Sequence, residues 1–133
     1  MTPQPNARSV LIVEDEAFTR MAAVDTVTDL GFESFEAGDA AEALDVLEEH
    51  PQVNILFTDI NMPGTMDGLA LAQLVHEVRP EVELIITSGA QTLAEEDIPD
   101  HGAFLPKPYA PDQLAALLQD GVRSRSISGQ STD

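Results

Sequence analysis

The sequence predicts an α/β fold in which helices cover both faces of a parallel sheet. Three observations support this fold class: short apolar runs recur along the chain, they are not interrupted by polar residues, and segments with helical spacing of apolar residues lie between them. Uninterrupted apolar strands are typical of a sheet that is buried on both faces. Strands that alternate with helices pair in parallel through right-handed crossovers. The expected order is therefore βαβαβαβαβα in a doubly wound sheet.

The first two strand–helix units occupy the N-terminal part of the chain. The run SVLIV at Ser9–Val13 predicts the first strand, and Glu33–Ala37 predicts a short second strand. Gly31 is a plausible end for the first helix, because glycine readily adopts the backbone conformation that terminates helices. The apolar positions of the two helices are spaced by three, four or seven residues and comprise Ala23, Val27, Leu30, Ala40, Ala43, Leu44 and Leu47.

Three further strands are predicted at residues 55–58 (ILFT), 84–87 (LIIT) and 103–105 (AFL). A third helix fits Gly68–Val78, and a last helix begins near Pro111, because proline suits the first turn of a helix. The apolar positions of these helices are Leu71, Ala72, Val75, Val78, Leu114, Leu117 and Leu118.

Three segments lack a regular pattern. Residues 92–102, TLAEEDIPDHG, are acidic and contain a proline, so we expect a short or irregular fourth helix there. Residues 1–8 are predicted to be a flexible N-terminus, and residues 124–133, SRSISGQSTD, a disordered polar tail. One folded domain is therefore expected over residues 9–123.

The chain is strongly acidic. Among its 133 residues, 24 are acidic and 6 basic, which gives a formal net charge of −18. Such a surface repels nucleic acids and anionic membranes, and it favours basic partners and bound cations. The absence of cysteine excludes disulfides and zinc–cysteine sites. With no export signal and no apolar run long enough to span a bilayer, a cytoplasmic location is expected.

Charged and hydroxyl residues follow four of the predicted strands, namely Glu14, Asp15, Asp59, Thr87, Ser88 and Lys107. The carboxyl ends of parallel strands meet at one edge of the sheet, where such folds bind ligands. Taken singly, an acidic pair could cap a helix, an aspartate could form a turn, and a lysine before proline could simply be solvated. Their joint occurrence instead indicates Mg²⁺ bound by carboxylates, with a lysine and a hydroxyl available to a phosphoryl group.

The motifs VLIVEDE, ILFTDINMPGTMDGLAL, IITSG and FLPKPY occur in this order on these elements. With them the chain resembles a response-regulator receiver domain of two-component signalling, of the single-domain type, over nearly its whole length. The resemblance implies a flavodoxin-like (βα)5 fold with strand order 2-1-3-4-5. It departs from the common pattern in having Glu14 where many receivers have aspartate and in a loop between Asp59 and Asp67 that is one residue longer.

The resemblance also implies a role for each residue of the site. Asp59 matches the phosphoacceptor, and Lys107 would pair with it and later with the phosphoryl oxygens. Asp15, Asp59 and the backbone carbonyl of Asn61 would bind Mg²⁺ directly, and Glu14 would bind it through water.

Three further features come with the resemblance. Thr87 matches the switch hydroxyl, although Ser88 is the alternative, and Phe104 matches the aromatic switch. The Lys107–Pro108 peptide bond is usually cis in this family.

The implied function is that of a response regulator, which accepts a phosphoryl group from a histidine kinase or a histidine phosphotransfer protein and then signals through protein contacts. Nucleic acid and membrane partners are not expected, and the chain would be a monomer or a phosphorylation-dependent dimer. The alternatives are an unphosphorylated pseudo-receiver that serves as an interaction module, and a receiver excised from a larger hybrid kinase or regulator. A small-molecule phosphatase is disfavoured, because Asn61 stands where a haloacid-dehalogenase-type enzyme needs its acid. We therefore expect no enzyme activity beyond assistance to the domain's own phosphoryl transfer and aspartyl-phosphate hydrolysis.

Overall fold

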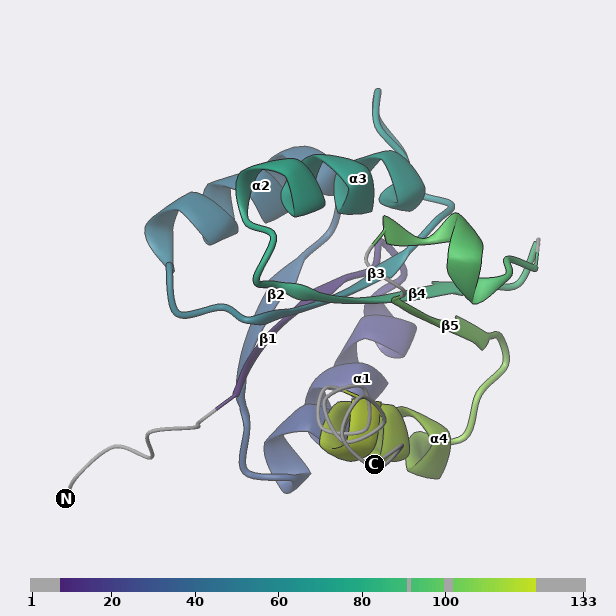
Figure 1. Cartoon of the computed structure of the whole chain (residues 1–133). Coiled ribbons are helices and arrows are strands. Elements are labelled where there is room, and N and C mark those ends of the chain that lie inside the picture. The colour runs from purple at the N-terminus through teal and green to yellow at the C-terminus, as the bar shows by residue number, and fades with distance from the viewer. Residues whose placement is uncertain (1–7, 91, 100–101, 122–133) are drawn as a thin grey trace, which may run out of the picture.

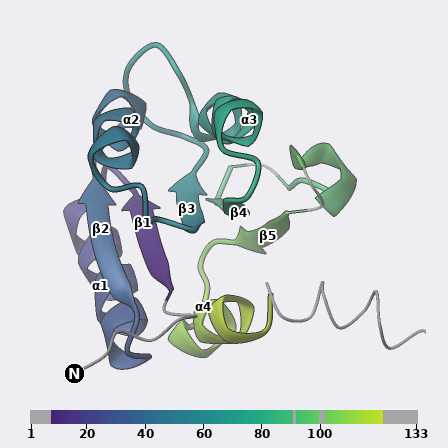
Figure 2. The ribbon, with the colours of Figure 1, turned by 60° about the vertical axis from the view of Figure 1, so that its left-hand side comes forward.

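The structure is a computed structural model and describes residues 8–90, 92–99 and 102–121. The predicted tail at 124–133 and, apart from Arg8, the predicted flexible N-terminus lie outside the described residues. The described residues form a parallel five-stranded sheet with the order β2-β1-β3-β4-β5, as predicted. Figure 1 shows the sheet between its helices, and Figure 2 shows the strands side by side in this order. The strands are β1 (Ser9–Val13), β2 (Glu33–Ala37), β3 (Ile55–Asp59), β4 (Glu83–Ser88) and β5 (Ala103–Pro106).

Helices cover both faces of the sheet. Helices α2 and α3 lie above it in Figure 1, and α1 and α4 lie below it. None of the helices in the described part of the chain is both long and apolar enough to cross a bilayer. Their bounds are α1 (Ala17–Asp29), α2 (Ala40–Glu49), α3 (Gly68–Val78) and α4 (Pro111–Ala116), and α4 runs on into the π-helical turn η3 (Leu117–Gly121).

The hydrophobic core has two layers, one on each face of the sheet. Alternate residues of β1 serve both layers, since successive side chains of a strand point to opposite faces. Val10 packs with Val27 and Leu114 on the face of α1 and α4, whereas Leu11 packs with Leu71 on the face of α2 and α3. Each fully buried leucine stabilises the fold by about 1.5–3 kcal/mol. The buried sheet therefore holds the residues at the ends of its strands in fixed positions.

The segment between β4 and β5, where a regular (βα)5 fold has its fourth helix, is the main departure from that pattern. Between β4 and β5 lies the short 3₁₀ helix η1 (Glu95–Asp97), in line with the short or irregular helix expected there. Ile98, with 2% of its surface exposed, anchors this segment in the core. A Cβ atom on Gly102 would lie 2.6 Å from the Ile98 side chain, so the close packing here requires glycine.

Candidate functional site

Three carboxylates meet at the carboxyl edge of the sheet. Glu14 and Asp15 follow β1, and Asp59 ends β3, which is the neighbour of β1 in the sheet. Each residue offers an oxygen within 4.8 Å of those of the other two. Glu14 and Asp59 are buried, with 4% and 5% of their surfaces exposed, whereas Asp15 is exposed. Burial of like charges at this distance is unfavourable unless a cation compensates them.

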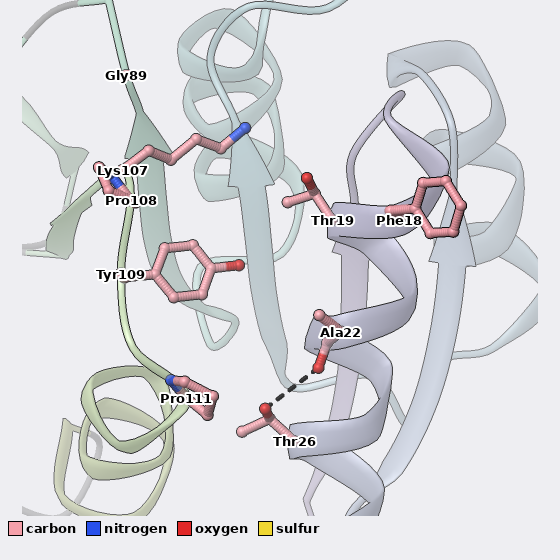
Figure 3. Close-up of a pocket in the computed structure, with 9 residues that line it drawn as sticks. All are labelled: Phe18, Thr19, Ala22, Thr26, Gly89, Lys107, Pro108, Tyr109 and Pro111. Carbon is pink, nitrogen blue, oxygen red and sulfur yellow. Dashed lines mark hydrogen bonds between the residues drawn. The ribbon is translucent and has the colours of Figure 1, made fainter.

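Lys107 supplies one such cation. It follows β5, and its ammonium group donates hydrogen bonds to Glu14 Oε1 at 2.9 Å and to Asp59 Oδ2 at 3.0 Å. Figure 3 shows the side chain extended away from Pro108, with Nζ at its far end. The Lys107–Pro108 peptide bond is cis, as the resemblance implied. One lysine therefore joins the ends of three strands.

The negative charges of this cluster outnumber its positive charge. Burial raises the pKa of Glu14, although hydrogen bonds from Lys107 and from the Glu16 amide oppose the rise. Burial also acts to lower the pKa of Lys107, but its hydrogen bonds to Glu14 and Asp59 outweigh burial, so that its pKa is raised. Lys107 therefore stays charged at neutral pH, yet among the described residues it is the only cation that forms an ion pair with any of the three carboxylates. The site retains a negative charge that attracts a further cation.

The loop after β3 folds back against Asp59. The Asn61 amide donates to Asp59 Oδ1 at 3.3 Å, and the Gly68 amide donates to the Ile60 carbonyl at 2.9 Å. A Cβ atom on Gly68 would lie 1.8 Å from the Asp59 carbonyl oxygen, so only glycine can begin α3 here. Gly64 turns this loop with a φ of 104°, a conformation that favours glycine. The sequence predicts Gly68 at the start of a helix, but no pattern in it indicates this contact.

Two hydroxyl groups lie next to Asp59, at the end of β4. Thr87 is the register partner of Asp59, is buried, and donates to the Leu105 carbonyl of β5 at 2.5 Å. Ser88 Oγ instead accepts from Asn61 Nδ2 at 3.2 Å and from the Ala90 amide at 3.0 Å. Thr87 thus links the site to β5, and Ser88 links it to the neighbouring loops.

Phe104, the predicted aromatic switch, lies on β5 opposite Ile86. It is partly buried and packs against the core layer of α2 and α3. The structure therefore places Thr87 and Phe104 on neighbouring strands, with the Thr87 hydroxyl bonded to the residue that follows Phe104.

A groove of about 690 Å³ opens beside Lys107, between α1 and the segment that joins β5 to α4. No pattern in the sequence indicates this groove, because its walls come from segments that are far apart in the chain, such as those of Thr19 and Tyr109. Tyr109 forms part of it, and burial and the charge of Glu14 raise the pKa of the Tyr109 phenol. Phe18 on the opposite wall is 79% exposed. The lining residues drawn in Figure 3 are Phe18, Thr19, Ala22, Thr26, Gly89, Lys107, Pro108, Tyr109 and Pro111.

Comparison with known proteins agrees with this arrangement. Residues 10–119 match the response regulator receiver domain family. The chain is 33% identical to the sensor kinase CckA of Brucella abortus, with 90% of the chain covered but only 13% of CckA. It is 32% identical to the chemotaxis protein CheY of Thermotoga maritima, with 84% of the chain and 94% of CheY covered.

A solved structure of a response regulator receiver protein from Sinorhizobium medicae WSM419 superposes with a TM-score of 0.81. It is 26% identical, and the match covers 92% of this chain and 99% of that one. On these matches, the chain belongs to the response regulator receiver domain family of two-component systems.

Proposed function

We propose that Asp59 accepts a phosphoryl group from a phosphohistidine, presented by a histidine kinase or a histidine phosphotransfer protein. The observation that carries the proposal is the position of Asp59: a buried carboxylate at the sheet edge that one lysine holds, with two further carboxylates beside it. Proteins of this family interact with histidine kinases or phosphotransfer proteins. The proposal concerns the receiver chemistry alone and is the same if these residues form part of a longer protein.

In the proposed reaction, a carboxylate oxygen of Asp59 attacks the phosphorus atom. A new phosphorus–oxygen bond forms, the phosphorus–nitrogen bond of the phosphohistidine breaks, and its electron pair stays on the departing imidazole nitrogen. For phosphoryl transfer, a protein mainly has to position the reacting groups and to place positive charge near the phosphoryl oxygens. Lys107 Nζ lies 3.0 Å from Asp59 Oδ2, which is within reach of those oxygens. The domain would assist its own phosphorylation and the later hydrolysis of the acyl phosphate, and we propose no other enzyme activity.

The residues of the site fit a magnesium ion. Mg²⁺ prefers oxygen ligands, and the site offers the carboxylates of Glu14, Asp15 and Asp59 together with surplus negative charge. The Asn61 carbonyl stands in the adjacent loop, and no residue in the described parts of the chain donates a hydrogen bond to it. When bound, Mg²⁺ would supply positive charge to the phosphoryl oxygens. We assign direct contacts to Asp15, Asp59 and the Asn61 carbonyl, and a contact through water to Glu14.

The signal would leave the site through β4 and β5. We propose that the Thr87 hydroxyl exchanges its bond with the Leu105 carbonyl for a bond with the phosphoryl group, and that Phe104 repacks in response. The altered surface would then be recognised by a protein in the cytoplasm. With a net charge of −18, neither nucleic acid nor membrane is a favoured partner, and the domain would act as a monomer or as a phosphorylation-dependent dimer.

The test is phosphorylation by acetyl phosphate in the presence of Mg²⁺. Mass spectrometry should show one added phosphoryl group that is stable in acid and labile in base. The gain should be absent from Asp59→Asn and should persist in Asp45→Asn, which changes an exposed aspartate on α2. No gain in the wild type would support the alternative of an unphosphorylated interaction module, and an equal gain in Asp59→Asn would place the phosphoryl group elsewhere.

A further inference from the structure

We propose that Glu14 is a positioning residue that holds Lys107 in place. Before phosphoryl transfer it shares this task with Asp59, and after the transfer, when the Asp59 carboxylate has reacted, it still holds the lysine. This inference rests on the proposed function, and it goes beyond the contact to Mg²⁺ through water that the resemblance assigns to Glu14. It gives Glu14 a task that is independent of the metal.

Both carboxylate oxygens of Glu14 are engaged by donors of the chain itself. Oε1 accepts from Lys107 Nζ at 2.9 Å, and Oε2 accepts from the Glu16 amide at 3.1 Å. The Glu14 side chain is only 6% exposed, so water competes little for either oxygen. The second bond fixes the orientation of the carboxylate, because Glu16 itself caps α1 by accepting from the Thr19 amide. Glu14 is therefore a rigid acceptor for the lysine.

Asp15, the next residue, is placed differently. It is exposed, and within the described parts of the chain no donor is hydrogen-bonded to its carboxylate. The two neighbouring acids thus differ: the Asp15 carboxylate has no donor from the described residues and can meet a cation from solution directly, whereas the Glu14 carboxylate already binds Lys107. Glutamate has one methylene group more than aspartate, so we expect an aspartate at this position to hold the lysine less well.

The contact matters most once Asp59 has reacted. An Asp59 oxygen that becomes bonded to phosphorus no longer offers the lysine the same carboxylate. Lysine has a long, flexible side chain, and ordering it during the reaction would raise the barrier. Glu14 keeps the ammonium group beside the phosphoryl oxygens and so removes part of this cost.

The test uses the fact that Lys107 is the only lysine in the sequence. Incorporation of ¹³C-labelled lysine gives a single ε-methylene signal by NMR, which can be recorded without metal and without phosphodonor. Glu14→Gln keeps the shape and the acceptor for the Glu16 amide but removes the charge. We expect the signal to move towards that of a free lysine side chain in Glu14→Gln, to change less in Asp59→Asn, and to move farthest in the double variant.

Asp15→Asn is the matched control and should leave the lysine signal unchanged. A signal that does not respond to Glu14→Gln, or that is released as fully by Asp59→Asn alone as by the double variant, would overturn the proposal. Circular dichroism checks that each variant is folded. Glu14→Asp is the second variant, in which the shortened side chain should release Lys107 in part.

A kinetic measurement separates the lysine contact from metal binding. With acetyl phosphate at saturating Mg²⁺, Glu14→Gln should be about 10- to 100-fold slower than the wild type, as expected for a displaced catalytic group. Additional Mg²⁺ should rescue Asp15→Asn but not Glu14→Gln; rescue of Glu14→Gln would overturn the positioning role. If the wild type takes up no phosphoryl group while its lysine signal still depends on Glu14, the proposed function fails and the lysine contact stands.

Discussion

The two edges of the sheet each hold a cation, but against different acceptors. At the amino edge, the guanidinium of Arg79 donates to the backbone carbonyls of Leu47, Pro51 and Val53 at 3.1, 2.7 and 2.6 Å. At the carboxyl edge, the ammonium of Lys107 donates to two buried carboxylates. Arg79 also pairs with the Glu81 carboxylate at 3.4 Å, but the Glu81 side chain is 64% exposed, so this ion pair contributes little.

The difference distinguishes a cation that stabilises the fold, Arg79, from one that belongs to the functional site, Lys107. Carbonyl groups carry no net charge, so the contacts of Arg79 are complete in themselves and join the α2–β3 connection to the end of α3. The carboxylates around Lys107 exceed it in charge, so that edge attracts a second cation. Removing contacts at the amino edge should therefore affect stability alone. Changes at the carboxyl edge should alter how the stability depends on metal and on pH.

The largest loss of stability is expected for Gly68→Ala at the carboxyl edge. The added Cβ would lie 1.8 Å from the Asp59 carbonyl oxygen, and backbone atoms cannot move aside as a flexible side chain can. We expect the free energy of unfolding to fall by about 3 kcal/mol, as measured by urea denaturation. Gly89→Ala is the control, since its Cβ would lie at an ordinary 3.5 Å from Lys107. Equal stabilities of the two variants would contradict the close approach.

Arg79→Ala should come next in size. It removes hydrogen bonds to three carbonyl groups and should lower the free energy of unfolding by about 2–3 kcal/mol. Phosphorylation by acetyl phosphate should proceed at the wild-type rate under conditions in which the variant is folded. A slowed reaction in the folded variant would mean that the two edges are coupled, and the comparison would fail.

The amino acid sequence predicted one edge of the sheet far better than the other. Glu14, Asp59 and Lys107 could be placed together because each directly follows a strand of uninterrupted apolar residues, and parallel strands end at a common edge. The contacts of Arg79 left no such signal, because its acceptors are backbone carbonyls, which every residue has.

Contacts that depend on the path of a loop could not be predicted from the sequence either. The approach of Gly68 to Asp59 depends on how the intervening loop returns to the sheet, and the direct bond between Lys107 and Glu14 spans 93 positions in the chain. The irregular segment around Glu95–Asp97 could be anticipated, because it has few apolar residues with which to pack a helix.

Magnesium should stabilise the protein through the carboxyl edge. A ligand that binds only the folded state raises the free energy of unfolding by about 1.4 kcal/mol when its concentration is about ten times its dissociation constant. We expect thermal unfolding to shift upward with Mg²⁺ in the wild type and in Asp45→Asn, which alters an exposed acid. The shift should be lost in Asp15→Asn. A rise of equal size in Asp15→Asn would mean that the ion acts by general screening of the −18 charge.

The smallest effect is a pH dependence that only the carboxyl edge should show. Burial raises the pKa of Glu14 above its usual 4.5, so the folded chain retains a proton that the unfolded chain has already released. The resulting stabilisation is complete below pH 4.5 and is lost as the pH rises through the higher value in the folded state.

Measured without metal, the free energy of unfolding of the wild type minus that of Glu14→Gln should therefore fall as the pH rises from 4.5. The corresponding difference for Arg79→Ala should stay constant, because a guanidinium does not titrate in this range. A constant difference for Glu14→Gln would mean that Lys107 fully offsets the burial of Glu14, and the charge imbalance between the two edges would be refuted.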